Sequence, residues 1–231
     1  MSTKPEIQFD AALHQYAVDN ELVPCHVTGI LEAYGIIDFS QVPAFTLQRK
    51  QLLGDLVHQI TAYIDQDGLT VDLAAGLVLD DEAEQCLAYD IDLDDVLPYS
   101  LAWTRFIKET GFVQRLIEHR WVPTVNGMRY GMTIDRAGVL AKRETILDIK
   151  CTHAREKSWP VQLAGYRLGL PLPERCARYE TANVWLKPDG TYSLCPGGRT
   201  KTDPTIERRD EEVFLAALRL AHWKLENLGH V

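Results

Sequence analysis

The chain has 231 residues, of which 46% are apolar and 25% are charged, and its formal net charge at pH 7 is −9. This composition excludes collagen-like and wholly disordered chains, and no run approaches the roughly 18 apolar residues that a membrane span needs. The first residues lack the apolar segment of a secretory signal, and the five cysteines include no Cys-x-x-Cys pair. We therefore expect reduced thiols in a cytoplasmic protein without a membrane partner.

The charge is distributed unevenly along the chain. Residues 136–178 contain nine Lys or Arg and four Asp or Glu, whereas the rest of the chain contains 15 basic and 29 acidic residues. Residues 80–95 contain eight acidic residues and no basic one. We expect this acidic stretch to be a solvated face or a loop that repels DNA. The negative net charge thus does not exclude nucleic acid as a ligand of the basic stretch.

The N-terminal part of the chain predicts a hairpin and a long helix. Residues 7–31 are typical of a short β-hairpin with a tip at Asp19-Asn20-Glu21, followed by a turn and the beginning of a helix. Residues 46–66 place their apolar side chains in one stripe at 100° per residue, which predicts an amphipathic helix. His58 lies on one flank of that stripe.

The middle of the chain changes from a helical period to a period of two. Residues 81–116 predict two helical pieces joined at Pro98, because proline is disfavoured inside a helix. Residues 128–135 alternate between apolar and polar, which predicts a strand that ends at Asp135. Residues 145–150 predict a second strand, and one of its faces carries Ile146, Asp148 and Lys150.

The C-terminal part predicts helix, strand and helix again. A helix is expected over residues 158–169, with Pro160 in its first turn, and a strand over residues 179–186. A tight turn at residues 188–190 follows, and residues 210–227 predict the last helix. The order of these elements indicates an α/β or α+β domain with one central sheet.

Two aspartates and a lysine on these strands suggest a chemistry. Asp148 and Lys150 are two residues apart on a strand, so their side chains share a face about 7 Å apart. If the two strands pair as a hairpin, Asp135 comes close to Asp148, and two such carboxylates repel each other unless a cation lies between them. Oxygen ligands favour Mg²⁺ or Mn²⁺, and a metal with a lysine suits phosphodiester hydrolysis.

A plainer interpretation competes with this one. An isolated Asp-x-Lys on a strand is most often a surface ion pair that contributes little to stability. Here, however, the neighbours Ile146, Leu147 and Ile149 predict a buried strand, and buried charges need a strong physical reason.

Four motifs in order along the chain resemble those of the PD-(D/E)XK nuclease superfamily, in its RecB-like and phage exonuclease-like branch. They are Gly54-x-x-x-His58, Gly131-x-x-x-Asp135, Asp148-x-Lys150 and Gln162-x-x-x-Tyr166. Residues 23–31 are similar to the opening segment of many phage and prophage members, so the resemblance covers about residues 9–227. It implies a restriction-endonuclease-like α/β core, with a central mixed β-sheet flanked by helices. We expect one domain over residues 1–231, with its core at about 44–227 and the N-terminal hairpin at about 7–31.

The resemblance also implies a role for each motif residue. Metal ligands would be His58, Asp135, Asp148 and the carbonyl of Ile149, with Glu118 as an additional acidic residue. Lys150 would orient the attacking water or stabilise developing charge, and Gln162 and Tyr166 would steady the site and touch the phosphate backbone. Taken alone, His58 is more typical of a partly buried histidine than of a metal ligand, and Gln162 and Tyr166 are typical of ordinary helix residues. Glu118 is equally typical of a solvated charge at a helix end.

The basic stretch provides a candidate DNA surface, and the cysteines argue against a cluster. Phosphate-tracking side chains are expected in the region of Arg155, Lys157 and Arg167, extending to Arg175 and Arg178, although scattered basic residues are often only solvated. Some RecB-like relatives hold an iron–sulfur cluster with a close trio of cysteines, which this chain lacks. We therefore expect no iron–sulfur cluster.

The sequence thus predicts an Mg²⁺- or Mn²⁺-dependent deoxyribonuclease in the cytoplasm of a bacterial cell or phage-infected host, acting in phage or prophage recombination or repair. No separate basic recognition helix is left over to read base edges, so an exonuclease that acts on ends or single strands is expected. A homo-oligomer or a recombination partner protein is left open. The alternatives are a catalytically silent nucleic-acid-binding module on the same fold, and an anti-defence protein whose acidic face mimics DNA.

Overall fold

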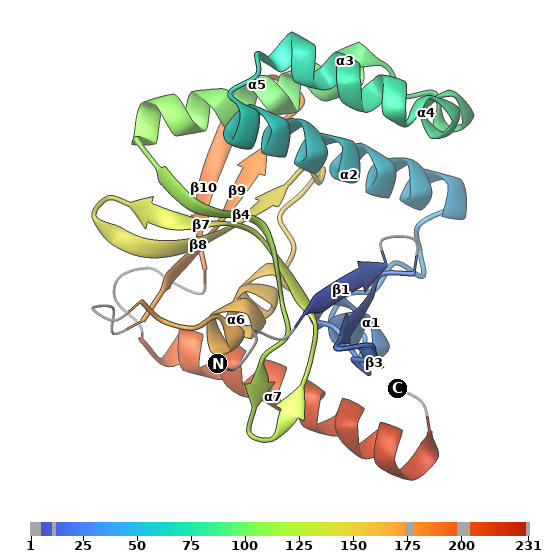
Figure 1. Cartoon of the computed structure of the whole chain (residues 1–231), viewed down its shortest axis with the longest axis vertical. Helices are drawn as coiled ribbons and strands as arrows, with labels where there is room; N and C mark the ends of the chain where they lie inside the picture. The colour runs from blue at the N-terminus through green and yellow to red at the C-terminus, as the bar shows by residue number, and fades with distance from the viewer. Residues whose placement is uncertain (1–5, 11–12, 174–177, 198–203, 230–231) are drawn as a thin grey trace.

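The computed structural model describes residues 6–10, 13–173, 178–197 and 204–229. A five-stranded mixed sheet forms its centre, in the order β10-β9-β8-β7-β4 (Figure 1). The pairs β4–β7, β7–β8 and β9–β10 are antiparallel, and β8–β9 is parallel. The strands are β4 (Val113–Trp121), β7 (Met132–Leu140), β8 (Arg143–Lys150), β9 (Glu180–Leu186) and β10 (Tyr192–Pro196).

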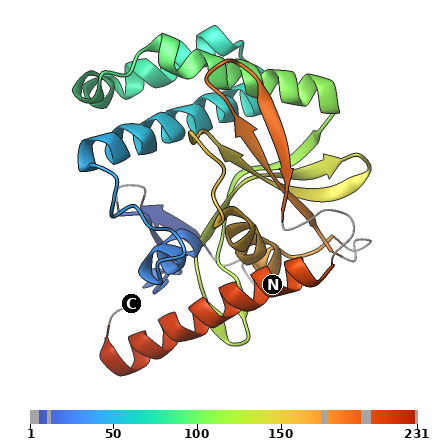
Figure 2. The same ribbon diagram turned by 180° about the vertical axis from the view of Figure 1, so that it is seen from behind.

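Helices cover both faces of this sheet, which confirms the predicted α/β class with a central mixed sheet flanked by helices. The first layer consists of α2 (Ala44–Asp67), α3 (Val71–Asp81), α4 (Ala83–Tyr89) and α5 (Leu93–Thr110). The second consists of α1 (Val27–Ala33), α6 (Trp159–Gly169) and α7 (Pro204–Leu228). Figure 2 shows α7 from behind, running along the side of α6 away from the first layer.

Strand β8 alternates between these layers as its sequence predicts. Leu147 and Ile149 are buried in the core of α2, α3 and α5, whereas Ile146 is buried against α1, α6 and α7. Asp148 and Lys150 share the face of Ile146, because side chains two apart on a strand point the same way. The two charged residues are therefore directed at the layer that contains α6.

The strand that carries Asp135 is longer than predicted. β7 continues past Asp135 to Leu140, and the chain turns at Ala141 and Lys142, whose φ angles are 48° and 66°. Such a two-residue turn with positive φ matches the twist of a hairpin. Alternation fails after Asp135 because Arg136 and Ala137 are both buried, one toward each helical layer. The sequence pattern therefore ends where the strand becomes buried on both faces.

The acidic stretch covers the end of α3, the whole of α4 and the beginning of α5, and most of its acidic side chains are exposed, as in the expected solvated face. Residues 81–116 were expected to break at Pro98, but α5 runs through Pro98 and the breaks lie at Glu82 and near Asp90. Asp92 accepts backbone hydrogen bonds at the N-terminus of α5 in a capping box with Asp95. Arg49 of α2 forms an ion pair with Asp95 at 2.9 Å. These contacts fix the start of α5 at Leu93, so Pro98 lies inside the helix.

The N-terminal hairpin has a third strand. β1 (Ile7–Asp10) pairs with β2 (Gln15–Val18), and the turn at Asp19-Asn20 connects β2 to β3 (Glu21–Leu22). The tip is therefore one residue shorter than predicted, because Glu21 already pairs with Val18. A separate small hairpin, β5 (Thr124–Val125) and β6 (Met128–Arg129), precedes β7. Within the described residues, no helix is both long and apolar enough to cross a membrane.

Candidate active site

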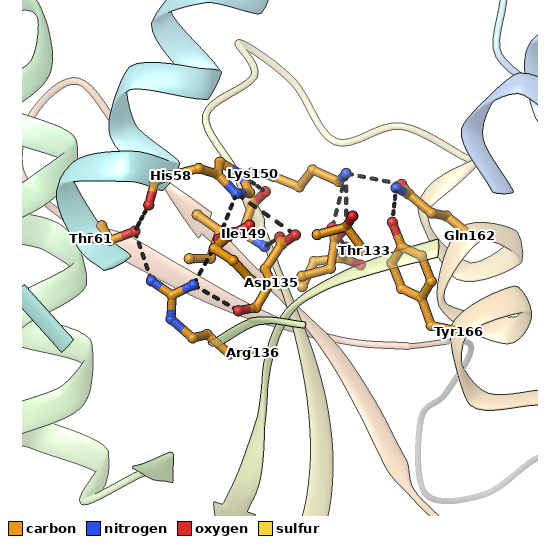
Figure 3. Close-up of polar contacts among 12 residues, drawn as sticks. His58, Thr61, Thr133, Asp135, Arg136, Ile149, Lys150, Gln162 and Tyr166 are labelled. Carbon is orange, nitrogen blue, oxygen red and sulfur yellow. Dashed lines mark hydrogen bonds and ion pairs between the residues drawn. The ribbon is translucent and has the colours of Figure 1, made fainter. Parts of the chain in front are cut away.

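Three potential metal ligands converge from α2, β4 and β7. The imidazole Nδ1 of His58 lies 3.5 Å from Oε1 of Glu118 and 3.7 Å from Oδ1 of Asp135 (Figure 3). One ligand atom of each residue lies within 4.8 Å of the other two. Glu118 and Asp135 lie between the ladder pairs Ile117–Arg136 and His119–Ile134 of β4 and β7, and His58 reaches them from the neighbouring helix. The three predicted residues thus form one compact cluster.

Glu118 has a backbone conformation that is unusual for a strand. Its φ angle is +46°, in the left-handed region that a non-glycine residue adopts only at a cost. Its carboxylate accepts a hydrogen bond from Arg136 at 2.8 Å and faces His58. Backbone strain of this kind is concentrated at functional sites, so the geometry favours a site residue over a solvated charge.

A second group of predicted residues forms a chain of hydrogen bonds from β8 to α6. Lys150 Nζ lies 2.9 Å from Asp148 Oδ2 and donates to Gln162 Oε1 at 2.9 Å. Gln162 Nε2 donates in turn to the hydroxyl of Tyr166 at 2.8 Å. All four side chains are largely buried. Both motif pairs, from the strand and from the helix, therefore meet at one place.

The structure adds Asn183 to this chain. Asn183 of β9 faces Asp148 in the parallel β8–β9 ladder, and its Nδ2 donates to Asp148 Oδ2 at 2.6 Å. No sequence signal identifies this contact, because nothing in the sequence shows which strand pairs beside β8. Asp148 is thus held by two donors, Lys150 and Asn183, and it lies outside the cluster of His58, Glu118 and Asp135.

Asp135 connects the two groups. Its Oδ2 accepts a hydrogen bond from the backbone N–H of Ile149 at 2.6 Å, while its Oδ1 faces His58. The carbonyl oxygen of Ile149 lies 3.3 Å from Nε2 of His58. The backbone between Asp148 and Lys150 therefore passes directly beside the His58 cluster, and the Ile149 carbonyl faces Nε2 of His58, whereas Nδ1 faces the two carboxylates.

The pKa values at the site reflect crowding of negative charge. Burial disfavours protonation of His58, but the carboxylates of Asp135 and Glu118 outweigh it and raise the pKa of His58 to about 9. Burial, together with the charges of Asp148 and Glu118, raises the pKa of Asp135 to about 7. Although burial opposes it, the charges of Asp148 and Asp135 also raise the pKa of Lys150. The excess of carboxylates thus stabilises the protonated forms of His58 and Lys150.

A buried arginine binds the Glu118 carboxylate of the cluster. Arg136 has no exposed side-chain surface and donates to Asp65 Oδ2 at 2.7 Å, to Glu118 Oε1 and to Thr61 Oγ1. The indole N–H of Trp103 and the amide of Gln114 donate to the same Asp65 carboxylate. No sequence motif predicts Arg136 and Asp65 as residues of the site. The available signal was that Asp65 lies seven residues after His58, on the same face of α2.

The expected DNA surface is divided among different environments. Arg155 and Lys157 are exposed in the loop between β8 and α6. Arg167 is 7% exposed and pairs with Glu211 of α7 at 2.8 Å. Arg178 lies 3.8 Å from Glu180, and Arg175 lies outside the described residues. The cysteines that are described, Cys25, Cys86, Cys151 and Cys195, are free thiols, and Cys176 is not among the described residues.

Comparison with known proteins gave distant likenesses. No family model matches the chain, and no curated protein matches it. An alkaline exonuclease (LHK-Exo) from Laribacter hongkongensis is similar over 78% of this chain and 97% of its own, with 16% identity and a TM-score of 0.35. The structure described as SSO0001 is similar over 71% of this chain and 74% of its own, with 17% identity and a TM-score of 0.31. At these TM-scores neither likeness assigns an activity to this chain.

Proposed function

We propose that this protein is a divalent-metal-dependent nuclease that hydrolyses phosphodiester bonds of DNA. The observation that carries the proposal is the His58–Glu118–Asp135 cluster, joined through the Ile149 backbone to the Asp148–Lys150 pair. A cation site beside a buried lysine is suited to a phosphate, because both neutralise the charge that builds up when water attacks phosphorus.

The chemistry of the donors fits Mg²⁺ or Mn²⁺. Two carboxylates, an imidazole and a backbone carbonyl are hard or borderline ligands, and no thiol belongs to the cluster. We propose His58, Glu118, Asp135 and the Ile149 carbonyl as ligands. Asp148 would join them by releasing one of its donors. The ion would polarise the scissile phosphate and lower the pKa of a bound water.

Lys150 is proposed to contact the reacting phosphate as an ammonium. The neighbouring carboxylates raise its pKa, so it stays charged at neutral pH and can donate hydrogen bonds. Asp148 and Gln162 hold its Nζ from two sides, and Tyr166 fixes Gln162 in turn. This support reduces the reorientation that Lys150 would need when substrate binds.

The proposed substrate is linear or single-stranded DNA, in the recombination or repair of a phage or prophage. Phosphate contacts position DNA without reading its sequence, so such a site selects by the shape of its substrate. Linear and covalently closed circular duplexes of identical sequence distinguish an exonuclease from an endonuclease. With Mg²⁺ or Mn²⁺ we expect shortening of the linear DNA alone. Discrete fragments from the closed circle would contradict action from ends.

Metal affinity is expected to depend on pH through His58. A ligand imidazole must be neutral, so the metal must displace a proton from His58 at any pH below its pKa of about 9. Between about pH 7 and pH 9, calorimetric titration with Mn²⁺ should show affinity that rises by about tenfold per pH unit, and the rise should be steeper below pH 7, where Asp135 is protonated as well. His58→Ala should bind Mn²⁺ more weakly, with a shallower pH dependence.

In the metal-free protein, His58→Ala should reveal the opposite pH trend, in stability instead of metal affinity. Because the folded-state pKa of His58 is above its usual value, its contribution to stability is fully present below about pH 6.5 and is lost as the pH rises through about 9. The Tm difference between the protein and His58→Ala should therefore shrink over that range. A variant that lowers Tm but leaves Mn²⁺ affinity unchanged would show that His58 only packs.

A further inference from the structure

The N-terminal hairpin is anchored to the strand region that leads into the site. Gly131, just before β7, accepts a hydrogen bond from Val27 N at 3.0 Å and donates to Cys25 O at 2.8 Å. A Cβ atom at Gly131 would overlap the ring of Tyr16. The glycine of the Gly-x-x-x-Asp motif is thus required because the Tyr16 ring from β2 packs on its backbone.

Tyr16 extends this anchor to the acidic cluster. Its hydroxyl lies 2.6 Å from Oγ1 of Thr133, which is two residues before Asp135 and on the same face of β7. Burial raises the pKa of Tyr16 to about 12, and the charges of Asp135 and Glu118 add to the shift. In Figure 3, Thr133 lies between Asp135 and the Gln162–Tyr166 pair. The hairpin therefore ends within the site.

Three further rings continue outward from Tyr16. The ring centroids of Phe9 and Tyr16 are 4.8 Å apart, those of Phe9 and His14 are 5.2 Å apart, and those of His14 and His26 are 4.5 Å apart. His14 is exposed, and Phe9 and His26 are partly exposed. Burial lowers the pKa of both histidines, so both rings are neutral at pH 7. We call Phe9, His14 and His26 the ring platform. The ring planes of Phe9 and His14 are at 86° to each other and those of His14 and His26 at 52°, so each ring offers a separate face, and His14 is the exposed member.

A cation completes this surface on the side of the acidic cluster. The guanidinium of Arg120 lies 4.5 Å from the centroid of the Phe9 ring. Arg120 faces Thr133 in the β4–β7 ladder, two residues after Glu118. A chain of groups thus leads from the proposed metal ligands through Thr133 and Arg120 to exposed neutral rings. A DNA strand carries each base next to a phosphate. A phosphate beside Arg120 would therefore place a base next to the rings.

We propose that the exposed His14 ring of the ring platform stacks against one unpaired base of the DNA strand whose backbone occupies the site, with Arg120 beside the adjoining phosphate. This rests on the proposed function and narrows its substrate to DNA with an unpaired base near the cleaved bond. Stacking on aromatic rings tolerates any base, because every base has a π-face. It requires an unpaired one, because neighbouring bases cover those faces inside a duplex.

The test combines base removal from the DNA with ring removal from the protein. The probe is a fluorescently labelled single strand of about 15 nucleotides, in which one abasic residue is moved along the chain. Binding is measured by anisotropy with Mn²⁺ in an Asp148→Asn background, and cleavage is measured with the unaltered site. His14→Ala removes an exposed ring, and Leu13→Ala removes the neighbouring side chain, which is 63% exposed and outside the platform.

We expect the abasic residue to weaken binding about tenfold at one position only. In His14→Ala the intact strand should bind correspondingly more weakly, and the abasic residue at that position should cause little further loss. Leu13→Ala should behave like the parent. Two results would contradict base stacking on the ring platform. One is an equal loss of affinity wherever the abasic residue is placed, and the other is the same abasic loss with and without the His14 ring. If the unaltered protein cleaves DNA in that case, the proposed function stands; if it does not cleave at all, the proposed function fails instead.

Discussion

Asp148→Asn and Lys150→Met are each expected to reduce DNA cleavage by about a thousandfold or more, while the protein remains folded. Asparagine keeps the shape of Asp148 and an acceptor for Asn183, but it removes the negative charge that holds the Lys150 ammonium. Methionine keeps the aliphatic stem of Lys150 and removes its donors to the phosphate. Initial rates on labelled single-stranded DNA with Mg²⁺ or Mn²⁺ measure the loss.

The matched control is Lys50→Met, which removes an exposed lysine from α2. Its cleavage rate should equal that of the unaltered protein. Circular dichroism and thermal unfolding show whether each variant is folded. A rate in either site variant within a few fold of the parent would show that the Asp148–Lys150 pair is structural only.

Arg136→Met is expected to lower the free energy of unfolding by about 3–5 kcal/mol, the largest stability effect at this site. Arg136 is fully buried, and its removal leaves the 4% exposed carboxylate of Asp65 without its cation. Glu118 loses a 2.8 Å partner at the same time. An uncompensated buried charge costs more than the ion pair contributes, so breaking the pair from one side is the harmful change.

Urea unfolding at neutral pH measures this loss. The informative companion is Arg136→Met combined with Asp65→Asn, which removes the stranded charge but keeps an acceptor for Trp103 and Gln114. The double variant should regain part of the stability that the single variant lost. A single variant that loses less than about 1 kcal/mol would mean that Arg136 does not secure the cluster.

Local patterns predicted the parts of the site that lie within one element. Alternation along residues 145–150 identified the face shared by Asp148 and Lys150, and Pro160 marked the beginning of the helix that carries Gln162 and Tyr166. Both predictions depend only on the period of a strand or a helix. That His58 and Asp135 lie at one site was implied only by the resemblance to the nuclease superfamily, and no local pattern predicts it.

Contacts between different elements could not be predicted from the period of a single strand or helix. Asn183 reaches Asp148 only because β9 pairs in parallel beside β8, and strand order is not written in the period of either strand. The sequence does not distinguish Arg136 from the other basic residues, because its partner Asp65 lies on another element 71 positions earlier. Pro98 was read as a break because the capping box that starts α5 depends on exact positions of Asp92 and Asp95.

The central claim is metal-dependent hydrolysis of DNA. The most direct measurement incubates the unaltered protein with end-labelled linear single-stranded and double-stranded DNA, in Mg²⁺, in Mn²⁺ and in excess chelator. We predict labelled products with either ion and none with chelator. DNA that stays intact with both ions, or that is cleaved equally well in chelator, would contradict the proposed function.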